Sequence, residues 1–388
     1  MESPPGGPPD TAAPKIVAVQ PESGSVTLRL GGDAVIRFDE VIDEMGGAGG
    51  SAAPTGLAAL VLLSPVTGVV GVEWHRTAIH VKPKEGWKPG RVYRLEVLPG
   101  ILDLRRNRLS EGRTMIFSTG PAIPTGAVTG TALLWTEQRP LGRALILAAP
   151  LPDTVPYIAL ADSTGAFRLG GIPTGDYVVY AVQDQNNNRQ RDPRESFDSA
   201  RVRVDSTADL MLWTFAHDTA PPRVRSADPV DSVTFRVTFS QHLDPGRRVN
   251  QSHVLVFALP DTTPVRVTAV LMPQAYDSLR ARERPAADSA GRDRAPAEAV
   301  RPPRAGPPAP TPPDTTAAAA ARARASRLLA GRPVPVDRLI IRTADPLRAG
   351  ARYLVRVRGI SSLSGVTGGG QQVLAIPETA RADTARAR

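Results

Sequence analysis

The sequence contains no cysteine, few lysines, few aromatic residues and no long hydrophobic run. Without cysteine the chain can form no disulfide, no thiolate metal site and no cysteine nucleophile. The longest apolar run, Leu57 to Leu63, is far shorter than the roughly 20 residues that a membrane-spanning helix needs. Aromatic residues make up only 5% of the 388 residues, whereas 39 prolines and 34 glycines are present. This composition favours several domains made of short strands and many turns over a helical enzyme.

Enzyme motifs are also missing. No lysine follows a glycine, which excludes a Gly-Lys-Ser/Thr phosphate loop, and no Gly-x-Ser-x-Gly nucleophile elbow occurs. His75 and His80 are expected on opposite faces of one strand, and the other three histidines are scattered along the chain. The acidic residues after Phe38 are interpreted as a turn that stabilises itself rather than as a catalytic carboxylate pair. The sequence therefore predicts a protein that is not an enzyme.

The positive charge is concentrated in one segment. The chain carries a net charge of +9 with only four lysines, so 43 of its 47 basic residues are arginine. Residues 280–332 hold 11 arginines and 5 acidic residues, which gives +6 of that +9. This segment is rich in proline and alanine and lacks aromatic residues, so nucleic-acid binding is not expected. We interpret it as a solvated spacer, with binding to an anionic surface as the alternative.

Three segments of the chain recur in the same order, which predicts one module used twice. Asp10 to Val17 returns as Asp218 to Val224, Phe38 to Asp43 returns as Phe239 to Asp244, and Gly90 to Val97 returns as Gly350 to Val357. The spacing between the first and last of these segments is 52 residues longer in the second copy, close to the length of the basic segment. A surface-loop insertion explains this difference, because loop-closure entropy rises only logarithmically with length.

Short β-branched or alternating runs predict the strands. In Val92 to Val97, Tyr93 and the residues in phase with it form an apolar face, whereas Arg94 and Glu96 lie on the other face. In the first module the expected strands are 15–19, 25–30, 34–38, 69–73, 78–81, 92–97 and 114–117. In the middle of the chain they are 128–134, 144–148, 166–169, 177–182, 201–204 and 209–213, paired antiparallel because the loops are short.

These patterns predict an all-β chain of three tandem β-sandwiches. The expected organisation is a flexible spacer (1–9), an Ig-like sandwich (10–120), a different sandwich (125–215), a second Ig-like sandwich (218–377) with a disordered insertion at about 280–332, and a disordered tail (378–388). Within the insertion, Ala317 to Leu329 predicts a short helix, with Thr316 before it and Gly331 after it.

Both copies resemble bacterial Ig-like domains of the type first described in the S-layer protein SbsA. The residues that carry the likeness are Phe38 to Asp43, Gly90 to Tyr93, Asp103 to Leu109, Phe117 to Thr119, and in the second copy Phe239 to Asp244 and Gly350 to Tyr353. The second copy shows Ser361 to Gly365 at the Asp-x-x-Gly-Asn-like turn and lacks the final Phe-x-Thr.

The middle module resembles the transthyretin-like sandwich of carboxypeptidase regulatory-like and collagen-adhesin B-type domains. Asp162 to Phe167 and Ile172 to Tyr177 carry this likeness. Together the resemblances imply β-sandwich folds and a place in exported envelope proteins or lipoproteins, as spacers, stalks or adhesive units. They imply no shared set of ligand-binding residues.

The loop after Val182 is the only candidate binding site. Oxygen-bearing side chains occupy positions 1, 3, 5, 9 and 12 of the twelve residues from Asp184 to Glu195, and position 7 can offer its carbonyl, as in a calcium loop. Arg189 stands where the sharp turn normally has glycine, and its charge opposes a divalent ion. The alternative is a polar turn in which Asp and Asn cap their own backbone. The candidate calcium ligands are Asp184, Asn186, Asn188, Gln190, Asp192 and Glu195.

The sequence as a whole predicts a non-enzymatic structural or interaction protein of the cell envelope or the extracellular space, with an unknown protein or a cell-wall glycan as its partner. Apart from calcium, no cofactor is expected, and the oligomeric state stays open. Export would require a signal upstream of Met1, which an internally assigned start codon would explain. An alternative role is glycan binding within a hydrolytic system. We interpret the four tryptophans (Trp74, Trp87, Trp135 and Trp213) as core or interface anchors rather than as a sugar platform.

Overall fold

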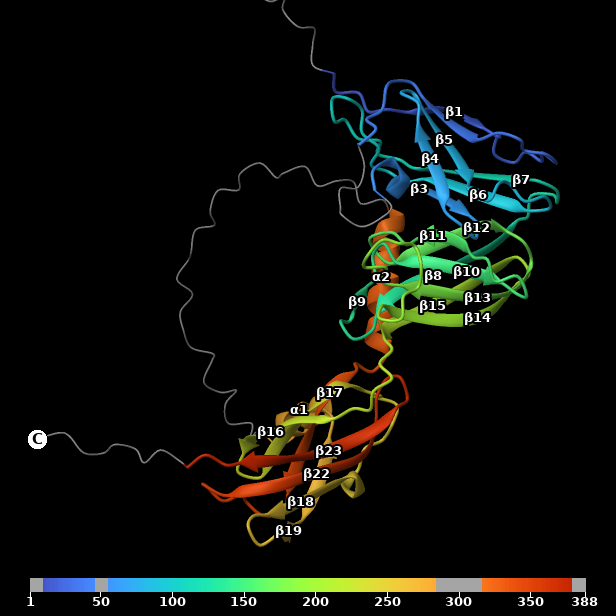
Figure 1. Cartoon of the computed structure of the whole chain (residues 1–388). Coiled ribbons are helices and arrows are strands. Elements are labelled where there is room, and N and C mark those ends of the chain that lie inside the picture. The colour runs from blue at the N-terminus through green and yellow to red at the C-terminus, as the bar shows by residue number, and fades with distance from the viewer. Residues whose placement is uncertain (1–9, 46–54, 284–315, 379–388) are drawn as a thin grey trace, which may run out of the picture. The chain divides into compact units, whose positions relative to one another are not determined.

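A computed structural model describes residues 10–45, 55–283 and 316–378 (Figure 1). The expected spacer at 1–9 and almost all of the expected tail, 379–388, lie outside these residues. The fold class predicted from the sequence is confirmed, because the described chain is nearly all β and its strands form sandwiches with separate apolar cores. Of the helices in the described ranges, none combines the length and apolarity needed to cross a membrane.

The first module is a sandwich of two antiparallel sheets. One sheet has the order β1-β2-β5-β4 and the other the order β3-β6-β7, with a short 3-10 helix, η1, leading into β3. Alternation places Ala34, Ile36 and Phe38 of β2 in the core and leaves Arg37 exposed. The elements are β1 Ile16–Gln20, β2 Ala34–Phe38, η1 Leu57–Leu60, β3 Val61–Ser64, β4 Val70–Trp74, β5 Ala78–Pro83, β6 Val92–Val97 and β7 Arg113–Ser118.

One predicted strand of this module is wrong. Residues 25–30 form no regular strand, and only Val26 makes an isolated bridge, to Ser118. The Ser118 amide donates to the Ser25 carbonyl and the Thr27 amide donates to the Ser118 carbonyl, so the segment pairs only with the end of β7. Val26 and Leu28 are 49% and 72% exposed, and of the apolar residues in this segment Leu30 packs against the core.

The middle module is built on one eight-stranded sheet in the order β11-β10-β13-β14-β15-β8-β12, with β9 paired to β8. The strands are β8 Gly126–Leu134, β9 Arg139–Pro140, β10 Leu145–Pro150, β11 Tyr157–Leu160, β12 Ala166–Ile172, β13 Gly175–Val182, β14 Ser196–Val204 and β15 Thr207–Ala216. The expectation of antiparallel pairing throughout is wrong, because β15 pairs with β8 in parallel. These two strands are the first and last of the module, so no short loop joins them and the loop-length argument does not apply.

The third module has the same strand order as the first. The order β16-β17-β21-β20 corresponds to β1-β2-β5-β4, and β18-β22-β23 corresponds to β3-β6-β7, with the short β19 added at the edge. The strands are β16 Val224–Asp231, β17 Thr234–Leu243, β18 Val254–Ala258, β19 Thr263–Val265, β20 Val267–Leu271, β21 Val336–Thr343, β22 Arg352–Ser361 and β23 Thr367–Ala375, with the 3-10 helix η2 Gln251–His253 before β18. Although the final Phe-x-Thr is missing, β23 forms, and Leu374 sits opposite Tyr353 as Phe117 sits opposite Tyr93.

The insertion lies between β20 and β21, where the first module has only the turn between β4 and β5. It begins with helix α1, Pro273–Glu283, and ends with helix α2, Thr316–Gly331, so the predicted helix is confirmed. The expectation of disorder at 280–332 is wrong at both ends, because residues 280–283 belong to α1 and 316–331 to α2. Alanine and arginine favour helix in α2, and Tyr276 of α1 is buried. Residues 284–315 lie outside the described part.

The described chain divides into two compact units. The first contains the first and middle modules, except Trp135–Glu137, together with Ala321–Leu329 of α2, and the second contains the third module and Trp135–Glu137. Within the first unit, the Arg324 guanidinium of α2 pairs with the Asp209 carboxylate of β15, and Ala325 is fully buried. Asp209 lies opposite Thr129 in the β15–β8 register, on the face of β8 that points away from the core. Part of the insertion thus covers the outer face of the middle sheet.

Candidate functional site

The predicted calcium loop connects β13 to β14, and its side chains mostly hold its own backbone. The Asp184 carboxylate accepts hydrogen bonds from the amides of Asn188 (3.2 Å) and Arg189 (2.9 Å). The Glu195 carboxylate accepts from the amides of Gln185 (2.9 Å) and Asp192 (3.1 Å), and Glu195 is 5% exposed. These contacts match the alternative of a self-capped polar turn.

The remaining candidate ligands also contact one another. The Asp192 Oδ2 atom accepts from Nδ2 of Asn186 (2.8 Å) and from Nδ2 of Asn188 (3.0 Å). The Gln190 amide donates to the Asn188 side-chain oxygen at 2.8 Å. Arg189 has a φ of +61°, the left-handed conformation for which calcium loops use glycine at this position. Calcium binding stays a prediction, and an ion would have to displace several of these hydrogen bonds.

The Arg189 side chain leaves the loop and enters the first module. Its Nη1 atom donates to the Val61 carbonyl at 2.6 Å, and its Nη2 atom donates to the carbonyls of Ala58 and Ala59, both at 2.8 Å. These carbonyls lie at the C-terminal end of η1, which has no basic residue of its own in its last turn. A cation there satisfies free carbonyls and complements the negative end of the helix dipole.

The Arg189 guanidinium is partly buried, so its hydrogen bonds replace the water that it has lost. Burial lowers the pKa of the Arg189 guanidinium to about 10, although the Asp184 carboxylate opposes that shift, so the group stays charged at neutral pH. Hydrogen bonds from a charged group are worth about 1.5–3 kcal/mol each, and they are not additive. Arg189, which the sequence marked only as a defect in a calcium loop, makes three hydrogen bonds from the middle module to the first.

Further contacts join the same two modules. The Ile158 amide, on edge strand β11, donates to the Ser64 hydroxyl of β3 at 3.0 Å, and the Arg91 guanidinium pairs with the Asp153 carboxylate at 2.9 Å. Tyr157 is 4% exposed, and burial raises the pKa of its hydroxyl to about 12. Gly171 has a φ of +72°, and a Cβ there would lie 2.2 Å from the Cδ1 atom of Ile116, so a larger residue would strain the backbone and displace that side chain. A hydrogen bond, an ion pair and a close approach of backbone to side chain thus join the two modules in addition to Arg189.

The interface also explains two charged residues on β6. Arg94 and Glu96 were expected on the polar face of this strand, yet Arg94 is 6% exposed. Their side chains form an ion pair at 2.9 Å. Burial lowers the pKa of Arg94 and raises that of Glu96, and each partner's charge opposes the shift in the other. The face they share with Ser64 of β3 is the one that contacts the middle module.

Loop 184–195 also lies beside a second apolar cluster. Leu145, Leu147 and Val182 are buried on the face of the middle sheet that points away from the main core, with Tyr180 and Phe197 packed against them. The Arg191 guanidinium lies 5.1 Å from the Tyr180 ring centre and 4.7 Å from that of Phe197. Arg191 thus stays on the middle module, whereas Arg189 reaches the first.

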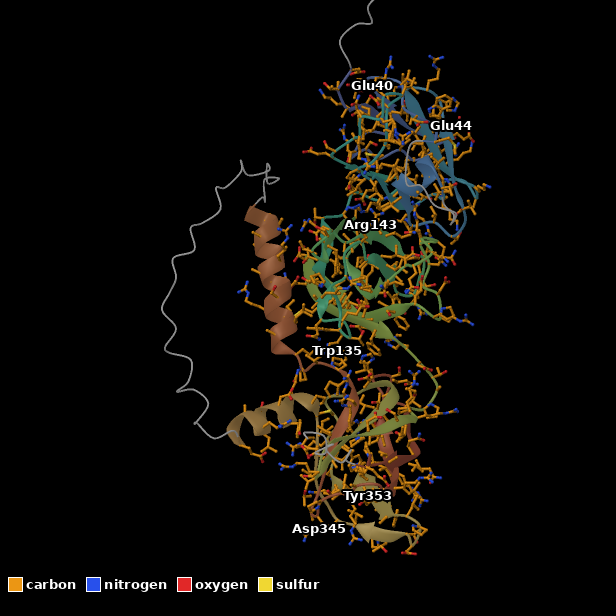
Figure 2. All side chains as sticks on the ribbon, turned by 90° about the vertical axis from the view of Figure 1, so that its left-hand side faces the viewer. Glu40, Glu44, Trp135, Arg143, Asp345 and Tyr353 are labelled. Atoms are coloured by element: carbon orange, nitrogen blue, oxygen red, sulfur yellow. The ribbon has the colours of Figure 1, made fainter. Side chains whose placement is uncertain are left out.

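An acidic cluster at one end of the first module was missed at the sequence level. Oxygen atoms of Asp10, Glu40 and Asp103 lie within 4.8 Å of one another. Burial raises the pKa of Glu40, and Asp103, Asp10 and Asp39 raise it further. The carboxylates of Asp39 and Asp43 instead accept backbone amides (those of Lys15 and Met45), as expected for a self-stabilising turn. Glu40 is labelled in Figure 2.

The corresponding positions in the third module carry less charge. Strand pairing aligns Asp10, Glu40 and Asp103 with Asp218, Gln241 and Ser362. The Gln241 amide group donates to the Asp218 carboxylate at 2.9 Å and to the Ala220 carbonyl at 2.8 Å. Comparison of the two repeats in sequence could have revealed this exchange of Glu for Gln.

The histidine expectation needs a correction. His75 follows β4 and His80 lies on β5, so a hairpin brings their ring centres to 4.1 Å instead of separating them on two faces of one strand. His80 contacts the Asp33 carboxylate at 3.3 Å, and Lys82 contacts the same carboxylate at 3.3 Å. The pair is part of an ion-pair network on this sheet.

The tryptophans serve as anchors. Nε1 of Trp74 donates to the Ile42 carbonyl at 2.9 Å, and Nε1 of Trp87 donates to the Gly32 carbonyl at 2.7 Å. Trp135 is 6% exposed, and Trp213 is partly buried. All four tryptophan side chains are therefore at least partly buried.

The geometry defines a tandem Ig-like β-sandwich protein. Residues 10–119 match the family model described as a bacterial Ig-like domain. No curated protein matches the chain.

Several solved structures are similar in part. The N-terminal part of the bacterial S-layer protein SbsC is 12% identical (TM-score 0.22), and the match covers 41% of this chain and 24% of that one. The major pilin subunit BcpA of Bacillus cereus is 11% identical (TM-score 0.19), with 52% and 70% covered. A putative carbohydrate binding protein from Bacteroides uniformis is 11% identical (TM-score 0.18), with 65% and 100% covered. These TM-scores are too low to carry an argument about function.

Proposed function

We propose that the chain is a non-enzymatic structural or interaction protein of the cell envelope or the extracellular space. The match of residues 10–119 to a bacterial Ig-like domain supports a structural or interaction role. The observation that carries the proposal is the use of charged side chains at the interface of the first two modules. Arg189 donates to three carbonyls, and the Arg94–Glu96 ion pair is buried at the same interface. The chemistry holds modules together, as a spacer or a stalk requires.

The third module is proposed as a second copy of the SbsA-type domain. The Tyr93 hydroxyl accepts from the Lys88 amide at 2.7 Å, and the Tyr353 hydroxyl accepts from the Arg348 amide, also five residues earlier, at 2.9 Å. The bridge between Ile42 and Asp103 corresponds to that between Leu243 and Ser362. These contacts and the common strand order support descent from one module.

The middle module is proposed to be transthyretin-like, of the carboxypeptidase regulatory-like kind. The residues that suggested this likeness form defined turns. The Asp162 carboxylate accepts from the amides of Thr164 (2.7 Å) and Ala166 (3.1 Å), and the Tyr177 hydroxyl donates to the Pro173 carbonyl at 2.7 Å. Such turns fix the ends of β12 and β13.

Cell fractionation tests the proposed location. The chain would be expressed from its native locus, with the DNA upstream of Met1 intact, and followed by immunoblotting of cytosolic, envelope and medium fractions. We expect the protein in the envelope or the medium, with protease sensitivity on intact cells if it is surface-exposed. A purely cytosolic pool would overturn the proposal.

Two binding roles remain as secondary proposals. Glycan binding through tryptophan loses support because those side chains are engaged, and a fluorescence titration with cell-wall glycans tests it directly. Binding of an anionic surface through residues 280–332 would depend on salt, so deletion of this whole segment, which carries a net charge of +6, should reduce the salt slope of binding to anionic vesicles. Arg280 and Arg324 already contact Tyr276 and Asp209, which reduces the arginines free for this role.

Calcium binding by loop 184–195 is tested by calorimetry on the whole chain. Because an ion must displace hydrogen bonds among Asp184, Asp192 and Glu195, we expect a dissociation constant no tighter than about 1 mM, the weak end for calcium modules. Asp192→Asn should abolish any heat that is seen. Micromolar affinity would show that the loop rearranges around the ion.

A further inference from the structure

The first and middle modules are joined by a covalent linker as well as by noncovalent contacts. Residues 119–125 connect β7 to β8 and contain Gly120, Pro121 and Pro124. A connection of this length alone would leave two sandwiches free to reorient, which is the default for domains joined by a small interface. What fixes their orientation must therefore be found among the side chains.

Arg189 is placed to fix it. It is the one residue of loop 184–195 for which described contacts reach the first module, and all three of its side-chain hydrogen bonds go to η1 or the residue after it. The loop is rigid at this point because the Arg189 amide is held by Asp184 and the loop base is closed by Glu195. The guanidinium is thus presented from a fixed backbone.

Helix η1, whose carbonyls accept these hydrogen bonds, depends on Arg189 for its C-terminal cap. Helix η1 has no side-chain cap at its N-terminus, and its C-terminal residue is followed directly by β3. Leu57 and Leu60 of η1 are buried in the core of the first module. The carbonyls that Arg189 binds would otherwise lack a basic partner, so the middle module supplies the C-terminal cap that the first module lacks.

We propose that Arg189 acts as a lock between the first two modules, meaning that it fixes their relative orientation. By capping η1 from the middle module, it makes the two modules one rigid unit that unfolds cooperatively. The Ser64–Ile158 hydrogen bond and the Arg91–Asp153 ion pair lie in the same interface and support the alignment, but neither replaces a cap of three bonds. The lock holds whether or not the chain works in the cell envelope, so its test is independent of the proposed function.

Distance measurements on the whole chain test the lock. Because the sequence has no cysteine, Ser110→Cys and Ser206→Cys, both at exposed positions, allow spin labels to be placed on the first and the middle module without competing sites. Electron–electron resonance should give one narrow distance distribution in the parent chain. Arg189→Ala should broaden it clearly, and Arg189→Lys should do so to a lesser degree because it keeps the charge and loses the planar fork.

Arg191→Ala is the matched control. It removes an arginine from the same loop, but the aromatic rings that Arg191 contacts, Tyr180 and Phe197, both belong to the middle module. The distance distribution should therefore stay narrow.

In calorimetry, Arg189→Ala should lower the first transition by about 5–10 °C and split it in two. Circular dichroism checks that both modules still fold. A narrow distribution and a single transition in Arg189→Ala would overturn the lock, as would equal broadening in Arg191→Ala.

Discussion

The first and third modules share a strand order but use the same sheet face in different ways. In the first module, Leu62 of β3 is 2% exposed, and its neighbour on that face, Ser64, contacts the middle module. In the third module, register places Leu255 of β18 at the position of Leu62, and Leu255 is 43% exposed. A sandwich thus keeps its core while its outer face serves either as an internal interface or as an open surface.

The face is also built from different residues. The strand registers show which positions correspond in the two modules. Ser64, Arg94 and Ile116 of the first module correspond to Phe257, Leu354 and Val373 of the third. The covered face therefore contains a buried ion pair, and the more open face contains apolar side chains. Burial in this chain follows what packs against a face, and hydrophobicity alone does not determine it.

The largest expected difference comes from adding a charge to this face. Leu62→Lys should destabilise the first unit by about 3 kcal/mol or more, because it buries an unpaired ammonium at a tight interface. Leu255→Lys should cost about 0.5 kcal/mol or less at its more exposed position. Denaturant unfolding of each variant measures both. Equal costs would mean that the two faces are not used differently.

A smaller effect tests whether the two modules share their tyrosine contact. Tyr93→Phe and Tyr353→Phe each leave a backbone amide, that of Lys88 or Arg348, without its hydroxyl acceptor. We expect each to cost about 1 kcal/mol, and to lower only the transition of the compact unit that contains it. Calorimetry of the two variants gives the comparison. If one substitution is neutral, the tyrosines do not play equivalent roles.

The smallest effect concerns the acidic cluster. Glu40→Gln copies the Gln241 of the third module and should stabilise the first module by up to about 0.5 kcal/mol at pH 7, the scale of exposed charge interactions. The folded-state pKa of Glu40 is raised, so the folded chain takes up its proton first and the penalty of the charged form disappears as the pH falls through that pKa. The variant and the parent should therefore converge in acid.

Thermal unfolding at several pH values measures this difference. Glu111→Gln serves as a control, because Glu111 is an exposed acidic residue of the first module that is not part of the cluster. It should leave the stability nearly unchanged at every pH. A gain from Glu40→Gln that persists at low pH would show that charge repulsion is not its cause.

Much of the fold was predictable because it depends on local patterns. Residues 34–38 and 92–97 alternate clearly, and both are strands with those bounds. Helix α2 was marked by its alanines and by Gly331. Edge strand β11, Tyr157–Leu160, was missed, and residues 25–30 were wrongly assigned because alternation does not reveal whether a partner strand is available.

The site was less predictable, because its partners are distant in sequence. Loop 184–195 was found from its oxygen pattern, but nothing local to Arg189 indicates carbonyls some 130 residues earlier. The burial of Arg94 likewise depends on a neighbouring module that strand periodicity cannot represent. Comparison of the two repeats was the one signal that could have located the acidic cluster.

Amide hydrogen exchange tests most directly the claim that one module design is used twice. The amides of Lys88 and Arg348 bond to tyrosine hydroxyls, and those of Asp103 and Ser362 bond to the carbonyls of Asn107 and Val366. We predict that both amides of each pair exchange slowly in the native chain, at rates set by the opening of the compact unit that contains each amide. Protection in the first module with free exchange at Arg348 and Ser362 would contradict the account.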